Sequence, residues 1–211
     1  MDSMRRIAVA VATLLACAAA LAAAPAPIPT KDAVAGIPQA ELTKRWWQWG
    51  FAFPPDESPL TDRTGARCTV GQEGPVWFLA GVVGEGPVQR TCHVPGNRPL
   101  FFPVVAYIYA PRDPSSSCAD LIRGARGATD SPMLFAELDG EPIADLEKRR
   151  LASGNCFNAG TRGTGDPELG LAASNGYWLA FPPLSKGRHR LHFGGTLPKL
   201  RQDITYTLIV E

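Results

Sequence analysis

The sequence lacks an excess of charge of either sign. It contains 21 Lys and Arg residues against 20 Asp and Glu residues, a formal net charge of +1 at pH 7. Binding to nucleic acid or to an anionic membrane surface relies on concentrated positive charge, which this composition does not supply. We therefore expect no nucleic-acid partner.

The chain also lacks the short motifs that mark several large enzyme classes. It has no G-x-S-x-G or S-x-x-K sequence, no H-E-x-x-H, no P-loop and no dinucleotide-binding glycine pattern. It has no C-x-x-C pair, so its cysteines do not predict a zinc site. We expect neither a cofactor nor a metal ion, and catalysis, if present, would rest on carboxylates or histidines.

A long apolar run occurs only at the N-terminus. Arg5 and Arg6 precede an apolar, alanine-rich stretch from Ile7 to Ala24, the pattern of a secretory signal peptide. We predict cleavage after Ala22, so that residues 1–22 are removed. The run is too rich in alanine to predict a permanent transmembrane anchor.

Cys17 offers an alternative route of export. Leu14-Leu15-Ala16-Cys17 approximates a lipobox, in which the cysteine would become an acylated N-terminus. The residues after Cys17 remain apolar, which favours ordinary cleavage and a secreted or periplasmic protein. Residues 23–37 are expected to form a flexible Pro/Ala-rich leader, and residues 38–211 a single domain.

The other four cysteines are even in number, and a chain bound for an oxidising compartment is expected to pair them. Of the three possible pairings, we predict the nearest-neighbour one, Cys68 with Cys92 and Cys118 with Cys156. A hairpin returning across the first pair would bring its two sulfurs within range.

Apolar periodicity predicts one helix and then strands. Leu42, Trp46 and Trp49 fall at i, i+4 and i+7 between Pro38 and Gly50, which is typical of a helix with one apolar stripe. Thereafter the period is two, and strands are expected over residues 76–80, 88–94, 100–108, 133–138, 188–193 and 204–210.

Two local signals refine this pattern. Pro103 removes a backbone donor from the third strand and predicts an edge position or a bulge. Ser117 and Asp120 have the spacing of a capping box, which predicts a short internal helix. About eight strands with short turns indicate a mostly β fold, an antiparallel β-sandwich of jelly-roll or immunoglobulin-like type.

Polar and aromatic residues gather between the helix and the first strand. Helical spacing assigns Trp46 and Trp49 to the core and leaves Trp47 exposed. Together with Asp62, Gln72 and Glu73, Trp47 forms our candidate ligand site. Turn capping explains Asp62 equally well, but paired carboxylates are also what glycoside cleavage needs.

The histidines give weaker signals. His189 and His192 resemble a metal pair, but an i, i+3 spacing on a strand places the rings on opposite faces. We interpret them as one core and one solvent-facing histidine. His93 has no neighbour in sequence to orient it as a general base.

Several segments together resemble a family of exported bacterial proteins. The motifs are W-W-x-W from Trp46, D-x-x-G-x-x-C from Asp62, G-Q-x-G-P-V-W-F-L-A-G from Gly71 and R-x-C from Arg90. The third is the most specific, and the match spans most of the mature chain. The resemblance implies an exported β-rich domain and carries no activity over to this chain.

Without a catalytic motif, the sequence favours an exported, non-catalytic protein that binds a saccharide or an envelope protein. The alternative is a carbohydrate-active hydrolase or lyase. A cleft with two carboxylates about 5 to 10 Å apart would favour the enzyme, and a flat aromatic face the binder. The oligomeric state is not predicted.

Overall fold

The computed structural model describes residues 25–83, 86–111, 115–160, 170–198 and 200–211. The predicted signal peptide and Cys17 lie outside this part of the chain. Residues 25–37, the rest of the expected leader, contact the domain: the Ile28 N–H donates to the Ala180 carbonyl (2.8 Å), and Val34 is buried.

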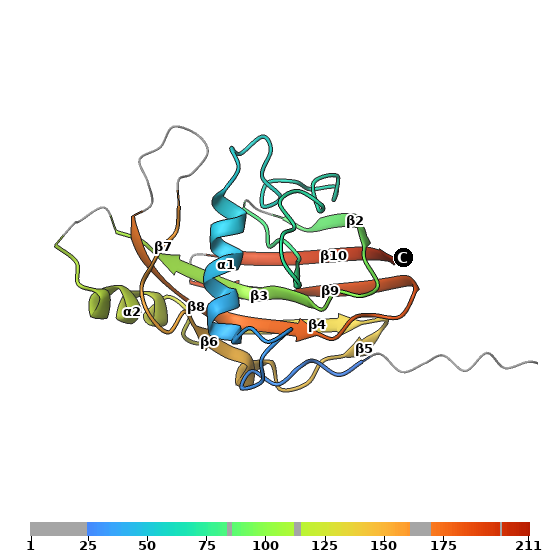
Figure 1. Cartoon of the computed structure of the whole chain (residues 1–211). Coiled ribbons are helices and arrows are strands. Elements are labelled where there is room, and N and C mark those ends of the chain that lie inside the picture. The colour runs from blue at the N-terminus through green and yellow to red at the C-terminus, as the bar shows by residue number, and fades with distance from the viewer. Residues whose placement is uncertain (1–24, 84–85, 112–114, 161–169, 199) are drawn as a thin grey trace, which may run out of the picture.

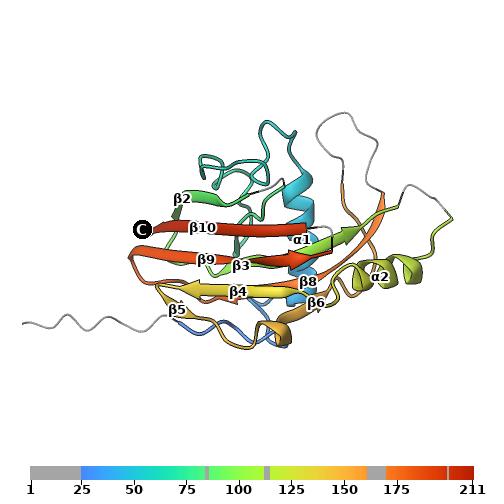
Figure 2. The same cartoon turned by 180° about the vertical axis from the view of Figure 1, so that it is seen from behind.

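Two β-sheets pack face to face, as expected for a β-sandwich (Figures 1 and 2). The first sheet has the order β1-β3-β8-β6, with β7 also paired to β8. Its strands are β1 (Trp77–Phe78), β3 (Leu100–Tyr109), β6 (Arg150–Ala152), β7 (Phe157–Asn158) and β8 (Leu171–Phe181). β1 runs parallel to β3, and the other pairings of this sheet are antiparallel.

The second sheet has the order β2-β10-β9-β4-β5. Its strands are β2 (Val88–Val94), β4 (Met133–Leu138), β5 (Glu141–Pro142), β9 (Gly187–Leu197) and β10 (Leu200–Val210). β2 runs parallel to β10, so both sheets are mixed and not purely antiparallel. Alternation in β10 buries Ile204, Tyr206, Leu208 and Val210 between the sheets, as the sequence predicts.

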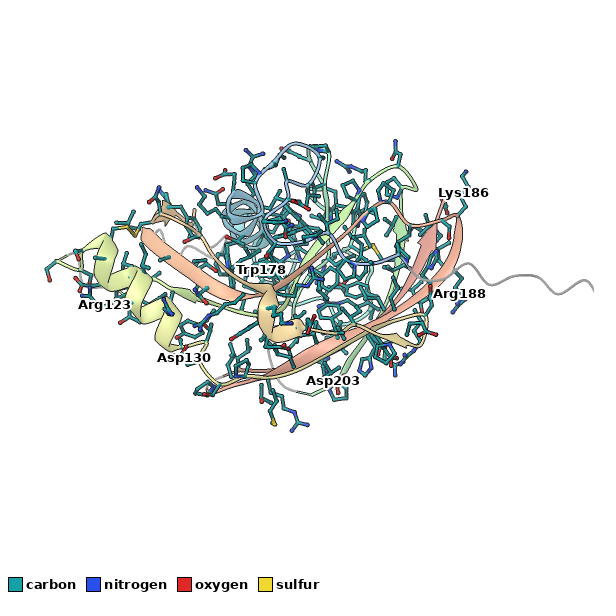
Figure 3. All side chains as sticks on the ribbon, turned by 90° about the horizontal axis from the view of Figure 1, so that it is seen from below. Arg123, Asp130, Trp178, Lys186, Arg188 and Asp203 are labelled. Atoms are coloured by element: carbon teal, nitrogen blue, oxygen red, sulfur yellow. A yellow bond between two sulfur atoms is a disulfide. The ribbon has the colours of Figure 1, made fainter. Side chains whose placement is uncertain are left out.

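Helix α1 (Gln39–Phe51) covers the outer face of the first sheet. Trp46 is 2% exposed and packs edge-on against Trp178 of β8, which in turn stacks on Phe101 of β3. Viewed along the layers, Trp178 lies close to α1, and Asp203 lies on the far side of the molecule (Figure 3). The described core therefore has three parts: one between the sheets, one beneath the helix and a small third cluster of Leu121, Ala125 and Ala173.

β3 is a buried strand that is interrupted by a bulge at Pro103. Phe102 faces the other sheet and Phe101 faces α1, so the strand is buried on both sides. The register with β8 shifts between Pro103 and Val105, which confirms the predicted bulge. The strand expected over residues 76–80 is much shorter, because β1 pairs with β3 only at Trp77 and Phe78.

The remaining elements follow their local signals. Helix α2 (Cys118–Gly127) begins at a complete capping box between Ser117 and Asp120. The turn between β4 and β5 has positive φ at Asp139 (55°) and Gly140 (85°), the conformation that Asp-Gly hairpins favour. The 3₁₀ helix η1 (Leu146–Arg149) leads into β6.

Both predicted disulfides are present. Cys68–Cys92 ties the loop that follows α1 to β2, and Cys118–Cys156 ties the start of α2 to the segment before β7. Cys92 is buried between the sheets at 1% exposure. Each bond therefore fastens an irregular segment to a regular element.

Candidate functional site

One edge of β3 has no strand neighbour over most of its length. β1 pairs only with the first two residues of β3. The chain after β1 then turns toward β10, where the N–H groups of Ala80 and Val82 donate to the Tyr206 hydroxyl and the Gln202 side-chain oxygen (both 3.1 Å). In the described chain, no strand pairs with this edge beyond Phe101.

Gln202 closes this edge at the bulge. Its Nε2 donates to the carbonyls of Pro103 (3.1 Å) and Val104 (2.8 Å), the two residues at which the β3 register changes. A Cβ at Gly81 would lie 2.7 Å from Gln202 Oε1, so glycine lets the chain approach this amide closely. The amide thus satisfies the carbonyls that the bulge displaces.

Beyond the bulge, the direction of the β3 backbone follows from its partner strand. The Ser153 N–H donates to the Ser174 carbonyl (2.9 Å), and the Ser174 N–H donates to the Ser153 hydroxyl (3.1 Å). Ser174 therefore points both backbone groups toward β6. Ile108 lies opposite Ser174 and forms a non-hydrogen-bonded pair with it, so the N–H and C=O of Ile108 point to the free edge. Hydrogen-bonded and non-hydrogen-bonded pairs alternate along antiparallel strands, so the N–H and C=O of Ala106, two residues away, point to the same edge.

A cleft of about 1020 Å³ lies along this edge. That volume is at the upper end of the range typical of small-molecule sites. The C-terminal half of β3 extends past α1 in both views of the fold (Figures 1 and 2). The lining comes from α1 and the loop after it, from β3, from the segment after β1 and from the β9–β10 hairpin. It includes Trp46, Trp47, Phe51, Leu60, Val82, Val83, Pro103, Ala106, Tyr107, Ile108, Thr196, Leu200, Arg201, Gln202 and Asp203.

Several polar side chains of the lining already have partners. The indole N–H of Trp46 donates to the Leu79 carbonyl (2.9 Å), and that of Trp47 donates to the Ser174 hydroxyl (2.6 Å). The Gln202 amide is fully engaged with backbone groups, as described above. The cleft therefore presents mainly apolar and aromatic side chains together with the β3 backbone.

The rim of the cleft adjoins an acidic and histidine-containing cluster on the outer face of the second sheet. Asp203 lies 2.9 Å from His192 Nε2, and Glu137 of β4 lies 3.8 Å from His192 Nδ1. The Phe135 ring is 4.8 Å from the imidazole. Asp203 is the single carboxylate among the described lining residues, whereas hydrolysis of a glycosidic bond uses two.

Arg90 supports the cleft from within the protein. This β2 side chain is 3% exposed and donates to the carbonyls of Asp62, Ala80 and Gly81 and to the Tyr206 hydroxyl. Its Nη2 has no hydrogen-bond partner among the described residues. Burial raises the pKa of Tyr206, even though Arg90 and the Ala80 N–H lower it. The phenol therefore stays protonated, and its hydroxyl donates a hydrogen bond to the Ala80 carbonyl.

The structure places the predicted site residues in separate surroundings. Trp47, expected to be exposed, is buried at 9%, which corrects that expectation. Its ring stacks on Phe51 at 5.4 Å and its N–H reaches β8, because α1 lies flat enough on the sheet to cover this side of the helix too. Of the four predicted residues, only Trp47 lines the cleft.

The other three lie in the loop after α1. Asp62 is 6% exposed and accepts hydrogen bonds from the N–H groups of Thr64 and Arg67, the turn-capping role. Gln72 exchanges hydrogen bonds with the Phe78 backbone and so fixes the loop to β1. Glu73 is exposed and lines a smaller groove of about 470 Å³ beside Arg45 and Trp49.

The three histidines lie on the second sheet. The side chain of His189 is 11% exposed between Asp139 (2.7 Å) and the Ser185 carbonyl (2.9 Å). His192 is on the opposite face, as expected, and His93 pairs with Glu211 at 2.6 Å. The described residues contain no group of three or more His, Cys, Asp or Glu side chains placed to hold a metal ion.

Apart from Trp47, sequence reasoning missed the residues that form the cleft. Tyr107, Arg201 and Gln202 carry no motif, and they meet only because the β9–β10 hairpin folds beside β3. Pro103 was the one available signal, because a proline in a buried strand indicates an edge or a bulge.

Comparisons with known proteins give no relative for this chain. No family model matches it, and neither the curated proteins nor the solved structures contain a match. Within the described residues, no helix has the length and apolar character needed to span a membrane.

Proposed function

We propose that this chain is an exported, non-catalytic binding protein and that the cleft beside β3 holds its ligand. The observation that carries the proposal is the combination of size and lining: about 1020 Å³ of space with aromatic and aliphatic walls and a polar rim. Binding sites are typically concave, mostly apolar and furnished with few polar groups.

The lining supports binding more than hydrolysis. Its one described carboxylate, on Asp203, is paired with His192, and the carboxylates of Asp62 and Glu73 are not part of the lining. Export is supported by the N-terminal pattern of Arg5, Arg6 and the apolar run, and by the two disulfides, which form in oxidising compartments.

The proposal is tested by screening the mature, disulfide-intact protein against a glycan array and a library of random linear peptides. Tyr107→Ala and Arg201→Ala, which change the wall and the rim, should each weaken any specific binder about tenfold or more. Arg188→Ala is the matched control, because Arg188 is exposed on β9 outside the lining, and it should leave affinity unchanged.

Three results would count against the proposal. The cleft would be ruled out as the binding site if neither cleft variant changes the affinity of the binders, or if neither collection yields a binder. Chemical conversion of a bound glycan, detected by product analysis, would show that the protein is an enzyme.

A further inference from the structure

We infer that the ligand is an extended peptide segment of a protein partner, which adds to the free edge of β3 as an extra strand. This inference rests on the proposed function and names the class of ligand for the same cleft.

The first support is the pattern of backbone groups. Ala106 and Ile108 each turn an N–H and a C=O toward the edge, and no described strand receives them. A second extended chain pairs with an edge strand in which every second residue presents one donor and one acceptor. The cleft lies directly along these residues.

The second support is that the buried polar side chains of the lining already have partners within the protein. A saccharide is bound largely through side-chain hydrogen bonds, but in this lining the indole N–H groups of Trp46 and Trp47 and the amide of Gln202 already bond within the protein. Asp203 is likewise paired with His192. Apart from the Tyr107 hydroxyl, the free hydrogen-bonding capacity of the β3 wall lies in its main chain, which favours a peptide over a sugar.

The two walls also define what the added strand should look like. Successive side chains of a strand point to opposite faces. One set would face α1, where Trp46, Trp47 and Phe51 form an aromatic wall, and the other would face the β9–β10 hairpin with Thr196 and Arg201. We therefore expect binding peptides to place apolar residues at every second position.

Gln202 limits where the added strand can begin. Its amide donates to the carbonyls of Pro103 and Val104, so an added strand can pair with β3 only from Ala106 onward. The edge nearer β1 is already satisfied by the Leu79 N–H, which donates to the Phe101 carbonyl (3.2 Å). The pairing region is therefore short and centred on Ala106 and Ile108.

The decisive experiment uses native protein and a peptide selected from the random library. A series of synthetic peptides, each with one backbone nitrogen methylated, is measured for affinity. Methylation at every second position of the central segment should weaken binding about tenfold or more, because it removes an N–H that donates to β3. Methylation at the intervening positions should change the affinity little.

A pair of protein variants tests the β3 side of the same bonds. Ile108→Pro and Ile108→Ala both shorten the side chain, but only proline removes the N–H that faces the edge. We expect Ile108→Pro to bind the peptide roughly tenfold more weakly than Ile108→Ala. Circular dichroism establishes that each variant is folded, and if Ile108→Pro is not, the methylated series on native protein decides alone.

The outcomes separate the two proposals. Strand addition would be overturned by a peptide that the cleft variants weaken but whose affinity does not alternate with the position of the methyl group. It would also be overturned if the cleft variants weaken a glycan and no peptide binds. Either result would leave the binding cleft intact. Absence of any cleft-dependent binder would overturn both.

Discussion

Asp62 shows how a single carboxylate can stabilise a loop. Burial by itself would raise its pKa, but hydrogen bonds from the N–H groups of Arg67 and Thr64 and from the Thr64 hydroxyl lower it, and the net result is a pKa below the ordinary value. A carboxyl with a lower pKa in the folded state stabilises the fold above its unfolded-state pKa of about 3.9. That contribution is lost as the pH falls through the folded-state pKa.

We predict that Asp62→Asn reduces the acid sensitivity of the fold. The free energy of unfolding of the native protein should fall between about pH 5 and pH 2 more steeply than that of the variant. At pH 7 the variant should be less stable by about 1 to 2 kcal/mol, because one of the captured N–H groups loses its acceptor. Urea unfolding across this pH range measures both effects, and parallel curves for the two proteins would contradict the assignment.

Helix α1 is held to the first sheet mainly by Trp46. The ring contacts Trp47, Trp49 and Trp178, and its N–H donates to the Leu79 carbonyl. The helix lacks a side-chain cap at its N-terminus, where Pro38 precedes Gln39, so tertiary packing must supply most of its stability.

We predict a graded response to substitution at this position. Trp46→Ala should destabilise the protein by about 3 to 5 kcal/mol, because it opens a cavity in the core beneath the helix. Trp46→Phe should cost less, since it keeps much of the ring but leaves the Leu79 carbonyl without its donor. Arg45→Ala, on the exposed side, should cost a few tenths of a kcal/mol through its ion pair with Glu41. Equal urea midpoints for Trp46→Ala and Arg45→Ala would show that α1 is not packed as described.

At the level of the whole molecule, the disulfides restrain two irregular segments, the loop after α1 and the segment before β7. Their sequence separations are 24 and 38 residues. In the chain-entropy model, loops of this length give roughly 3 to 4 kcal/mol each. That is a large share of the 5 to 15 kcal/mol typical of a folded domain's net stability.

Reduction should therefore lower the melting temperature by well over 10 °C, as measured by calorimetry with and without a thiol reductant. The paired variants Cys68→Ala/Cys92→Ala and Cys118→Ala/Cys156→Ala separate the two bonds. The first pair should be the more damaging, because Cys92 is also a core residue. A melting temperature insensitive to reductant would refute the expected contribution of both bonds.

Local sequence determined much of this fold. Alternating residues predicted the strand over residues 204–210 that is β10, and the Ser117–Asp120 spacing predicted the start of α2. Each of these depends on residues close together in the chain, where side-chain direction and turn geometry follow from the residues themselves. The cysteine pairing was also predicted correctly, from nearest-neighbour spacing.

Only the tertiary structure decided where the cleft lies. Sequence placed Trp47, Asp62, Gln72 and Glu73 together because they are neighbours along the chain, yet their surroundings depend on how α1 and the following loop settle on the sheets. The cleft joins Trp47 with Ile108 and Arg201, which lie on three separate elements. Whether β3 keeps a free edge depends on how far β1 follows it, and that is fixed by long-range contacts of Ala80 and Val82 with β10 that no local pattern encodes.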